Sequence, residues 1–175
     1  MMKYLIVVLS LLIVRNSDAQ AEDANFLLNK SEVVWQKVYD TKMTKQELIT
    51  YFKASEKFWL VQVVADTIFT KLKPQKIDPV KTGVAGVPPI VNKTEYKGVV
   101  RIELKENKYR ITLKNIVLIG DGEILKKGEE QTFEQNYLNK EQTEYRPFFL
   151  KRPKEIYNIH FNELFQIAVK AKEEW

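Results

Sequence analysis

The chain has 175 residues, with 28 Lys and Arg, 23 Asp and Glu, and a formal net charge of +5. It contains no cysteine and one histidine, which excludes disulfides, a lipid-modified cysteine anchor and cysteine nucleophiles, and leaves too few ligands for a typical zinc site. The charges are interspersed without a block of like sign, which indicates a solvated surface rather than a polyanion-binding tail.

The first residues, 1–19, have the three parts of a secretory signal peptide. A lysine supplies a positive start, an apolar run covers residues 4–14, and Ser17 and Ala19 have the spacing of small residues at a cleavage site. The apolar run is about half of the roughly 20 residues that a spanning helix needs. We therefore expect cleavage after Ala19, no stable membrane anchor afterwards, and export to the periplasm or cell envelope.

Residues 20–31 are polar and are expected to be flexible. Beyond them "VVWQKVYDT" alternates, with Trp35 and Tyr39 on one side and Val34 and Val38 on the other. This alternation predicts a first strand with aromatic residues on one face.

A helix start follows in "MTKQEL". Thr44 and Glu47 have the spacing of a capping box, and Met43 and Leu48 that of a hydrophobic staple. These signals predict a helix from residue 45 to about residue 58. Residues 59–65 combine helical spacing with the β-branched content of a strand, so the sequence leaves this segment open between the two.

Residues 68–72 predict another strand, and a segment with six Pro and Gly positions between Pro74 and Pro89 predicts a long loop or an irregular edge. Next, "KGVVRIELKENKYRITLKNI" (97–116) predicts a β-hairpin that turns at Glu106 and Asn107. The predicted apolar pairs are Leu104 with Tyr109, Ile102 with Ile111, and Val100 with Leu113. A slip by one residue would break every pair, so the register is well determined.

The second strand is able to run on to a turn at residues 120–122. Residues 126–145, rich in Glu, Gln and Lys, predict either a mobile excursion or a peripheral strand pair. A C-terminal amphipathic helix then carries one stripe of residues: Phe161, Leu164, Phe165, Ala168 and Lys172.

This order of elements predicts one α+β domain over residues 32–175. Its sheet has one polar face and packs its other face against an N-terminal-half helix and a C-terminal helix. With 45% hydrophobic residues, a chain of this length is able to form the core of a single domain without disulfides.

These segments resemble a known family. "TKQEL" at the first helix, "TIFTKLKP" before the sheet core, "KGVVRIELKENKYRITLKNI" as that core and a closing amphipathic helix, behind a signal peptide, are similar to the bacterial domain of unknown function 4468. The resemblance covers residues 32–172 and implies a TBP-like fold, a curved antiparallel sheet wrapped against helices. It implies no activity, catalytic residue or DNA binding, because function belongs to sites and not to folds. Ser55 and the long stretch 126–145 depart from the family pattern.

Few residues are available for catalysis or metal binding, and we predict no catalytic, cofactor-binding or metal-binding residue and no cofactor. His160 is expected at the start of the last helix, without a G-x-S-x-G motif elsewhere, and reads as a polar residue at a helix entrance. "GDGE" offers only Asp121 and Glu123 to a calcium ion, so a hairpin turn accounts for it better.

Two surfaces were candidates for partners. The charged side of the hairpin carries residues of both signs: Arg101, Glu103, Lys105, Glu106, Lys108, Arg110 and Lys114. Because the signs are mixed and no aromatic residue is expected on that face to stack a base, nucleic acid is not an expected partner. In "RPFFLKRP" (146–153), Phe148, Phe149 and Leu150 either pack under the sheet, which is the favoured interpretation, or touch a membrane surface or a partner.

We therefore expect an exported, non-enzymatic binding module that takes an unknown protein or small-molecule ligand through the sheet or the Pro/Gly loop. The alternative is a hydrolase-like enzyme with carboxylates in a cleft between sheet and helices. A buried carboxylate pair with shifted pKa values would mark the enzyme, and a closed apolar cavity under the sheet would mark a ligand carrier.

Overall fold

The computed structural model describes residues 25–167. The predicted signal peptide and two members of the predicted C-terminal stripe, Ala168 and Lys172, lie outside the described residues. The strands are β1 (Phe26–Asn29), β2 (Glu32–Asp40), β3 (Phe58–Val64), β4 (Thr67–Lys76), β5 (Thr94–Lys105), β6 (Lys108–Gly120) and β7 (Glu130–Thr132). The helices are α1 (Lys45–Ala54), α2 (Pro79–Thr82), α3 (Pro89–Asn92), α4 (Phe133–Tyr137), α5 (Pro147–Lys151) and α6 (Pro153–Phe165).

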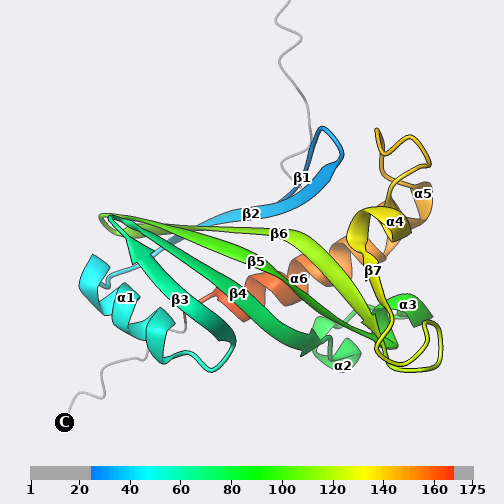
Figure 1. The fold of residues 1–175 in the computed structure, drawn as a ribbon, viewed down its shortest axis with the longest axis horizontal. Helices are drawn as coiled ribbons and strands as arrows, with labels where there is room; N and C mark the ends of the chain where they lie inside the picture. The colour runs from blue at the N-terminus through cyan, green and yellow to red at the C-terminus, as the bar shows by residue number, and fades with distance from the viewer. Residues whose placement is uncertain (1–24, 168–175) are drawn as a thin grey trace, which may run out of the picture.

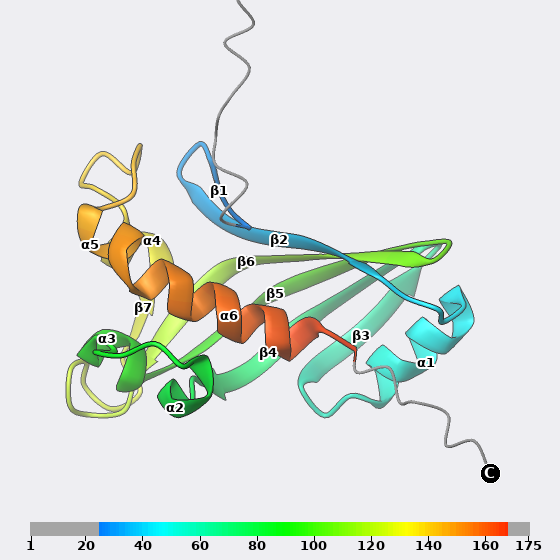
Figure 2. The same ribbon diagram turned by 180° about the vertical axis from the view of Figure 1, so that it is seen from behind.

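The strands form one antiparallel sheet in the order β1-β2-β6-β5-β4-β3, and β7 pairs with the last part of β6. Helix α6 crosses one face of this curved sheet: it lies behind the sheet in Figure 1 and in front of it in Figure 2. Within the described part of the chain, no helix lies over the middle of the opposite face (Figure 1). The predicted α+β fold, with helices packed on one face of an antiparallel sheet, is confirmed.

The core lies between the sheet and α6. Trp35 of β2 packs against Phe161 and Phe165, with ring centroids 5.6 and 5.7 Å apart. The Tyr109 hydroxyl on β6 donates a hydrogen bond to the Phe165 carbonyl oxygen at 3.0 Å and accepts one from the Ile167 amide at 3.1 Å. These bonds fasten the end of α6 to the sheet, because they satisfy a carbonyl group that a helix C-terminus leaves unpaired.

The hairpin of β5 and β6 has the predicted register. The apolar pairs are all present: Leu104 with Tyr109, Ile102 with Ile111, and Val100 with Leu113. Asn107 in the turn has a φ of 59°, a left-handed conformation that Asn tolerates well. On the other side of the hairpin, Arg110 donates two hydrogen bonds to Glu103, at 2.8 and 2.6 Å.

The first helix is shorter than predicted. Its capping box of Thr44 and Glu47 is present, but α1 ends at Ala54 rather than near residue 58. Ser55 has an extended backbone, with φ −71° and ψ 122°, and Phe58–Val64 pairs with β4. The segment that the sequence left open is therefore a strand, in keeping with its β-branched content.

The prediction of a flexible segment over residues 20–31 is wrong from Phe26 onward. Phe26–Asn29 forms β1, and its register places Phe26 opposite Trp35. Phe26 is buried, and its ring lies 5.3 Å from that of Phe149. Burial of the Phe26 side chain stabilises this strand, although residues 20–31 are mostly polar.

Residues 126–145 form neither a mobile excursion nor a strand pair. They contain the short strand β7 and helix α4, whose Phe133 and Tyr137 are fully buried. Thr132 and Gln135 form a second capping box at the start of α4. The Pro/Gly segment likewise contains two short helices, α2 and α3, after β4 has continued through Pro74 to Lys76.

Candidate binding site on the open face of the sheet

The face opposite α6, called the open face below, is built by the alternation of side chains along each strand. In β5, Tyr96 and Val100 are buried against the helices, so Lys97, Val99 and Arg101 point the other way. Neighbouring strands add side chains to this face by register: Lys71 and Phe69 lie opposite Val99 and Arg101, and Trp59 lies opposite Lys71.

Three adjacent strand pairs are irregular at the same level of the sheet. The register shifts between Trp59 and Gln62 in the β3–β4 pair, between Leu72 and Gln75 in β4–β5, and between Lys97 and Val99 in β5–β6. Leu60 and Asn115, which flank this line, have φ values of 52° and 50°. A bulge bends its strand and redirects side chains, so bulges in neighbouring strands hollow the face between them.

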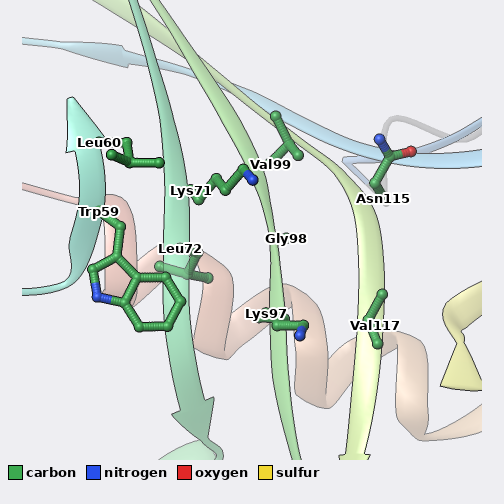
Figure 3. Close-up of a pocket in the computed structure, with 9 residues that line it drawn as sticks. All are labelled: Trp59, Leu60, Lys71, Leu72, Lys97, Gly98, Val99, Asn115 and Val117. Atoms are coloured by element: carbon green, nitrogen blue, oxygen red, sulfur yellow. The ribbon is translucent and has the colours of Figure 1, made fainter. Parts of the chain in front are cut away.

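A hollow of about 510 Å³ lies on this line of bulges. Its lining residues are Trp59, Leu60, Lys71, Leu72, Lys97, Gly98, Val99, Asn115 and Val117. Figure 3 shows Trp59 and Leu60 at one side, Asn115 and Val117 at the other, and the two lysines and Val99 between them. Trp59 is 46% exposed and Leu60 is 74% exposed, so this apolar wall faces solvent.

A second hollow, of about 570 Å³, continues from the first across the open face. Its lining residues are Leu27, Leu28, Asn29, Glu32, Val34, Gln36, Phe69, Val99, Arg101, Thr112 and Lys114. The two hollows share Val99. Together they form the open-face groove, which runs from β3 at one edge of the sheet to β1 at the other.

The charged residues in the groove lining are mainly cationic: Lys71, Lys97, Arg101, Lys114 and Glu32. Lys97 forms an ion pair with Glu130 at 2.5 Å, and Lys114 lies 3.8 Å from Glu32. Lys71 forms no ion pair with any residue from 25 to 167.

One carboxylate next to the groove, that of Glu103, already has cationic partners. Glu103 accepts hydrogen bonds from Arg110 and lies 3.4 Å from Arg101. The hydrogen bonds from Arg110, helped by the positive charges of Arg101 and Lys105, lower the pKa of Glu103 despite partial desolvation.

The charged side of the hairpin carries no aromatic residue of its own, as predicted, but neighbouring strands place two aromatic side chains on the same open face. Phe69 is 42% exposed on the open face, and Trp59 lies on the same face. Both come from strands outside the hairpin. The alternation of "TIFTKL" in the sequence already predicts that Phe69 lies on the other face of the strand from Ile68 and Thr70. The strand order, which brings Phe69 beside Arg101, could not be predicted from the sequence.

His160 lies in the second half of α6, not at its start, because that helix begins with Pro153. Its ring is edge-on to Tyr96, with centroids 5.6 Å apart, on the helix-covered side of the sheet. Burial lowers the pKa of His160 to about 4; Lys57 and Lys81 contribute in the same direction and Asp78 opposes them. His160 therefore has no part in the groove.

The other residues weighed from the sequence are structural or peripheral. Asp121 and Glu123 lie near lysines, at 3.5 Å from Lys76 and 2.7 Å from Lys93, which supports the turn interpretation. In α5, Phe149 is buried in the aromatic core, whereas Phe148 and Leu150 are each about half exposed. The packing interpretation thus holds for Phe149 alone.

The described carboxylates do not show the burial or the raised pKa that would mark a general acid. No Asp or Glu among the described residues is buried. The carboxyls with shifted pKa values, Glu47, Glu103 and Glu129, all have the pKa lowered, mainly by hydrogen bonds. Across residues 25–167, no group of three His, Cys, Asp or Glu side chains is placed to hold a metal ion. In the same range, no helix is both long and apolar enough to cross a membrane.

Fold and site together define an α+β sheet domain that covers one face of its sheet with helices and leaves a hollowed, apolar and basic face open. No family model matches the sequence, and no curated protein is detectably similar to it.

Two solved structures are similar to the fold. A TBP-like protein from Parabacteroides distasonis ATCC 8503 has 18% identity and a TM-score of 0.49, with 79% of this chain and 90% of that chain covered. A DUF4468 family protein from Bacteroides ovatus ATCC 8483 has 14% identity and a TM-score of 0.46, with 80% and 86% covered. The structural similarity agrees with the resemblance seen in the sequence and assigns no activity.

Proposed function

We propose that the protein is a non-enzymatic binding module that takes its partner in the open-face groove. The observation that carries the proposal is the exposure of Trp59 and Leu60 beside a line of three bulges, on a face that no described helix covers. A contiguous apolar patch rimmed by polar residues is typical of an interaction site.

The chemistry of the described residues favours binding over hydrolysis. A carboxylate enzyme needs a general acid with a raised pKa, and the shifted carboxyls of this chain have lowered values. The groove also opens to solvent along its length, which suits a macromolecular partner better than an enclosed small-molecule carrier.

The proposed module acts outside the cytoplasm, in the periplasm or cell envelope, after removal of residues 1–19. The support is the signal-peptide pattern of the sequence. N-terminal sequencing and mass measurement of the protein recovered from its own cells test it. We expect Gln20 as the first residue, and a protein that retains Met1 would contradict export by cleavage.

Photo-crosslinking tests the groove as the binding site. The photoreactive residue p-benzoylphenylalanine replaces Trp59 in protein produced in its own cells, and the matched control carries it at Val80, which is 86% exposed on α2 outside the groove. We expect an adduct of defined mass from position 59 and none from position 80. Equal adducts from both positions, or none from position 59, would contradict the proposal.

A further inference from the structure

The groove has a charge preference that its proposed binding role does not by itself require. Four of its five charged lining residues are cations, and they are distributed over both hollows: Lys71 and Lys97 in the first, Arg101 and Lys114 in the second. Three of these cations already lie near a carboxylate: Lys97 near Glu130, Arg101 near Glu103 and Lys114 near Glu32. Lys71 has no ion-pair partner among residues 25–167 and is the cation most available to a ligand. The cations come from β4, β5 and β6, so an incoming carboxylate meets positive charge along the middle of the groove, in both hollows.

The floor between these cations is mainly aliphatic. Val99 of β5 joins the two hollows, with Leu60 toward β3 and with Val117, Val34 and Leu27 toward β1. The two aromatic side chains, Trp59 and Phe69, line different hollows and do not form a continuous stack. Such a floor suits apolar side chains rather than a row of bases, which need successive aromatic platforms.

The groove also has a length. It crosses six strands, and a spacing of about 4.8 Å between neighbours gives roughly 24 Å. That distance matches about seven residues of extended chain, at about 3.3 Å each, or about sixteen residues of α-helix, at 1.5 Å each. A flat bilayer does not enter a hollow of this kind, whereas a single protein segment does.

We infer that the partner presents an acidic amphipathic segment of a protein, about seven to sixteen residues long. Its apolar side chains lie on the valine and leucine floor, and its carboxylates pair with Lys71 and Lys97 in one hollow and with Arg101 and Lys114 in the other. This inference rests on the proposed function, because it names the partner of the same groove.

Selection from a random sixteen-residue peptide library tests the inference. The full mature chain is the bait, and the selected peptides are then measured by fluorescence anisotropy against three variants. Trp59→Ala removes part of the apolar wall. Lys71→Glu/Lys114→Glu reverses one cation in each hollow, and Lys127→Glu/Lys140→Glu makes the same change of net charge at exposed positions outside the groove. Thermal unfolding by circular dichroism tests whether each variant is folded. If the double charge reversal does not fold, Lys71→Gln replaces it in the binding measurement.

We expect selected peptides rich in Asp and Glu that alternate with aliphatic or aromatic residues. Their affinity falls at least about tenfold with Lys71→Glu/Lys114→Glu, weakens with added salt, and stays within about twofold with the matched control. Peptides that depend on Trp59 but not on Lys71 and Lys114 would overturn the inference and leave the proposed function standing. Failure to select any peptide that depends on Trp59 would overturn the inference, whereas the proposed function would be overturned by the absence of a photo-crosslink from position 59.

Three further probes identify other occupants, and each positive result overturns the acidic-segment inference. A sixteen-nucleotide oligothymidine, or vesicles of phosphatidylglycerol, would have to bind with the same dependence on Lys71 and Lys114 while no acidic peptide does. Dimerisation in sedimentation equilibrium that Trp59→Ala abolishes would identify a second copy of the chain.

Discussion

Ile102 and Arg101 are neighbours in β5 but lie on opposite faces of the sheet. Ile102 is fully buried, opposite Ile68 on one side and Ile111 on the other. Arg101 is exposed on the open face, and its Nη2 lies 3.4 Å from Oε2 of Glu103. Two adjacent residues therefore have opposite tolerance to charge.

We expect Ile102→Asp to unfold the domain, because an unpaired carboxylate in this position costs more than about 4 kcal/mol. Charge reversal at the exposed positions, Arg101→Glu/Lys114→Glu, should change the free energy of unfolding by no more than about 1 kcal/mol. Far-UV circular dichroism and urea unfolding measure both. A folded Ile102→Asp protein would show that the register of the hairpin is wrong.

His160 makes stability depend on pH. Its pKa is 6.5 in the unfolded chain and about 4 in the folded one, chiefly because of burial, so the unfolded state binds more protons between these two values. The stability contributed by neutral His160 is complete above pH 6.5 and is lost as the pH falls toward 4.

We expect the free energy of unfolding to fall between pH 7 and pH 5 by about 2 kcal/mol more in the wild type than in His160→Gln. Urea titrations at pH 7, 6 and 5 give the comparison, and the variant serves as control for the carboxyls that titrate in the same range. Equal losses in the two proteins would show that His160 titrates normally.

Several residue positions were readable from the sequence and others were not. Val100 and Leu113 were paired correctly because a two-residue turn and a period of two leave no second register. His160 was misplaced although Pro153, a residue favoured at the first turn of a helix, marks the true start of α6. Trp59 and Phe69 were not assigned to the binding face, because that assignment needs the order of β3, β4 and β5 in the sheet.

Among the elements, β3 has an unusual backbone for an edge strand. Leu60 has a φ of 52°, which favours glycine, yet its side chain is 74% exposed and lines the groove. A left-handed conformation costs a leucine about 1–2 kcal/mol. Leu60 therefore makes the fold less stable than glycine would at this position, as is common for residues that serve binding.

We expect Leu60→Gly to leave the free energy of unfolding unchanged or to raise it by up to about 1 kcal/mol. Gln62→Gly, at an exposed position of the same strand with no left-handed φ, should lower it by about 0.5–1 kcal/mol. Thermal unfolding compares the stability of the two variants with that of the wild type. A clearly destabilised Leu60→Gly would contradict the left-handed backbone at this bulge.

Element boundaries that a turn or a cap marks were predicted well, and unmarked boundaries were not. The hairpin has its turn and the start of α1 has its capping box, whereas nothing in "KASEKFWLVQVV" separates the end of α1 from β3 by composition. Helix α4 had a readable capping box at Thr132 and Gln135, but the polar composition around it concealed the signal. Strand β1 depends on one buried phenylalanine and its tertiary partners.

At the scale of the whole molecule, one aromatic core connects both edges of the sheet to α6. Trp35 contacts Phe161 and Phe165, and Phe165 also stacks on Phe58 of β3, with centroids 6.4 Å apart. Loss of α6 would thus expose both halves of the sheet together, which is the condition for a cooperative unit.

We expect a single unfolding transition. In a Trp59→Phe/Trp175→Phe variant, which keeps Trp35 as the single tryptophan, the fluorescence and far-UV circular dichroism curves in urea should coincide within error. A fluorescence midpoint clearly below that of circular dichroism would show that the core around Trp35 opens before the rest of the sheet.

The pairing of β2 with β6 determines the order in which the chain can be assembled. Trp35 lies opposite Leu113, so during synthesis the first long strand emerges well before the strand that completes its hydrogen bonds. Local hairpins close quickly, whereas a distant pairing must wait for its partner and for the entropy cost of a long loop. Strand β2 can pair with β1 as soon as both are made, but we expect the part from Gln36 to Asp40 to wait for β6. The sheet can therefore be completed only late in the production of the chain.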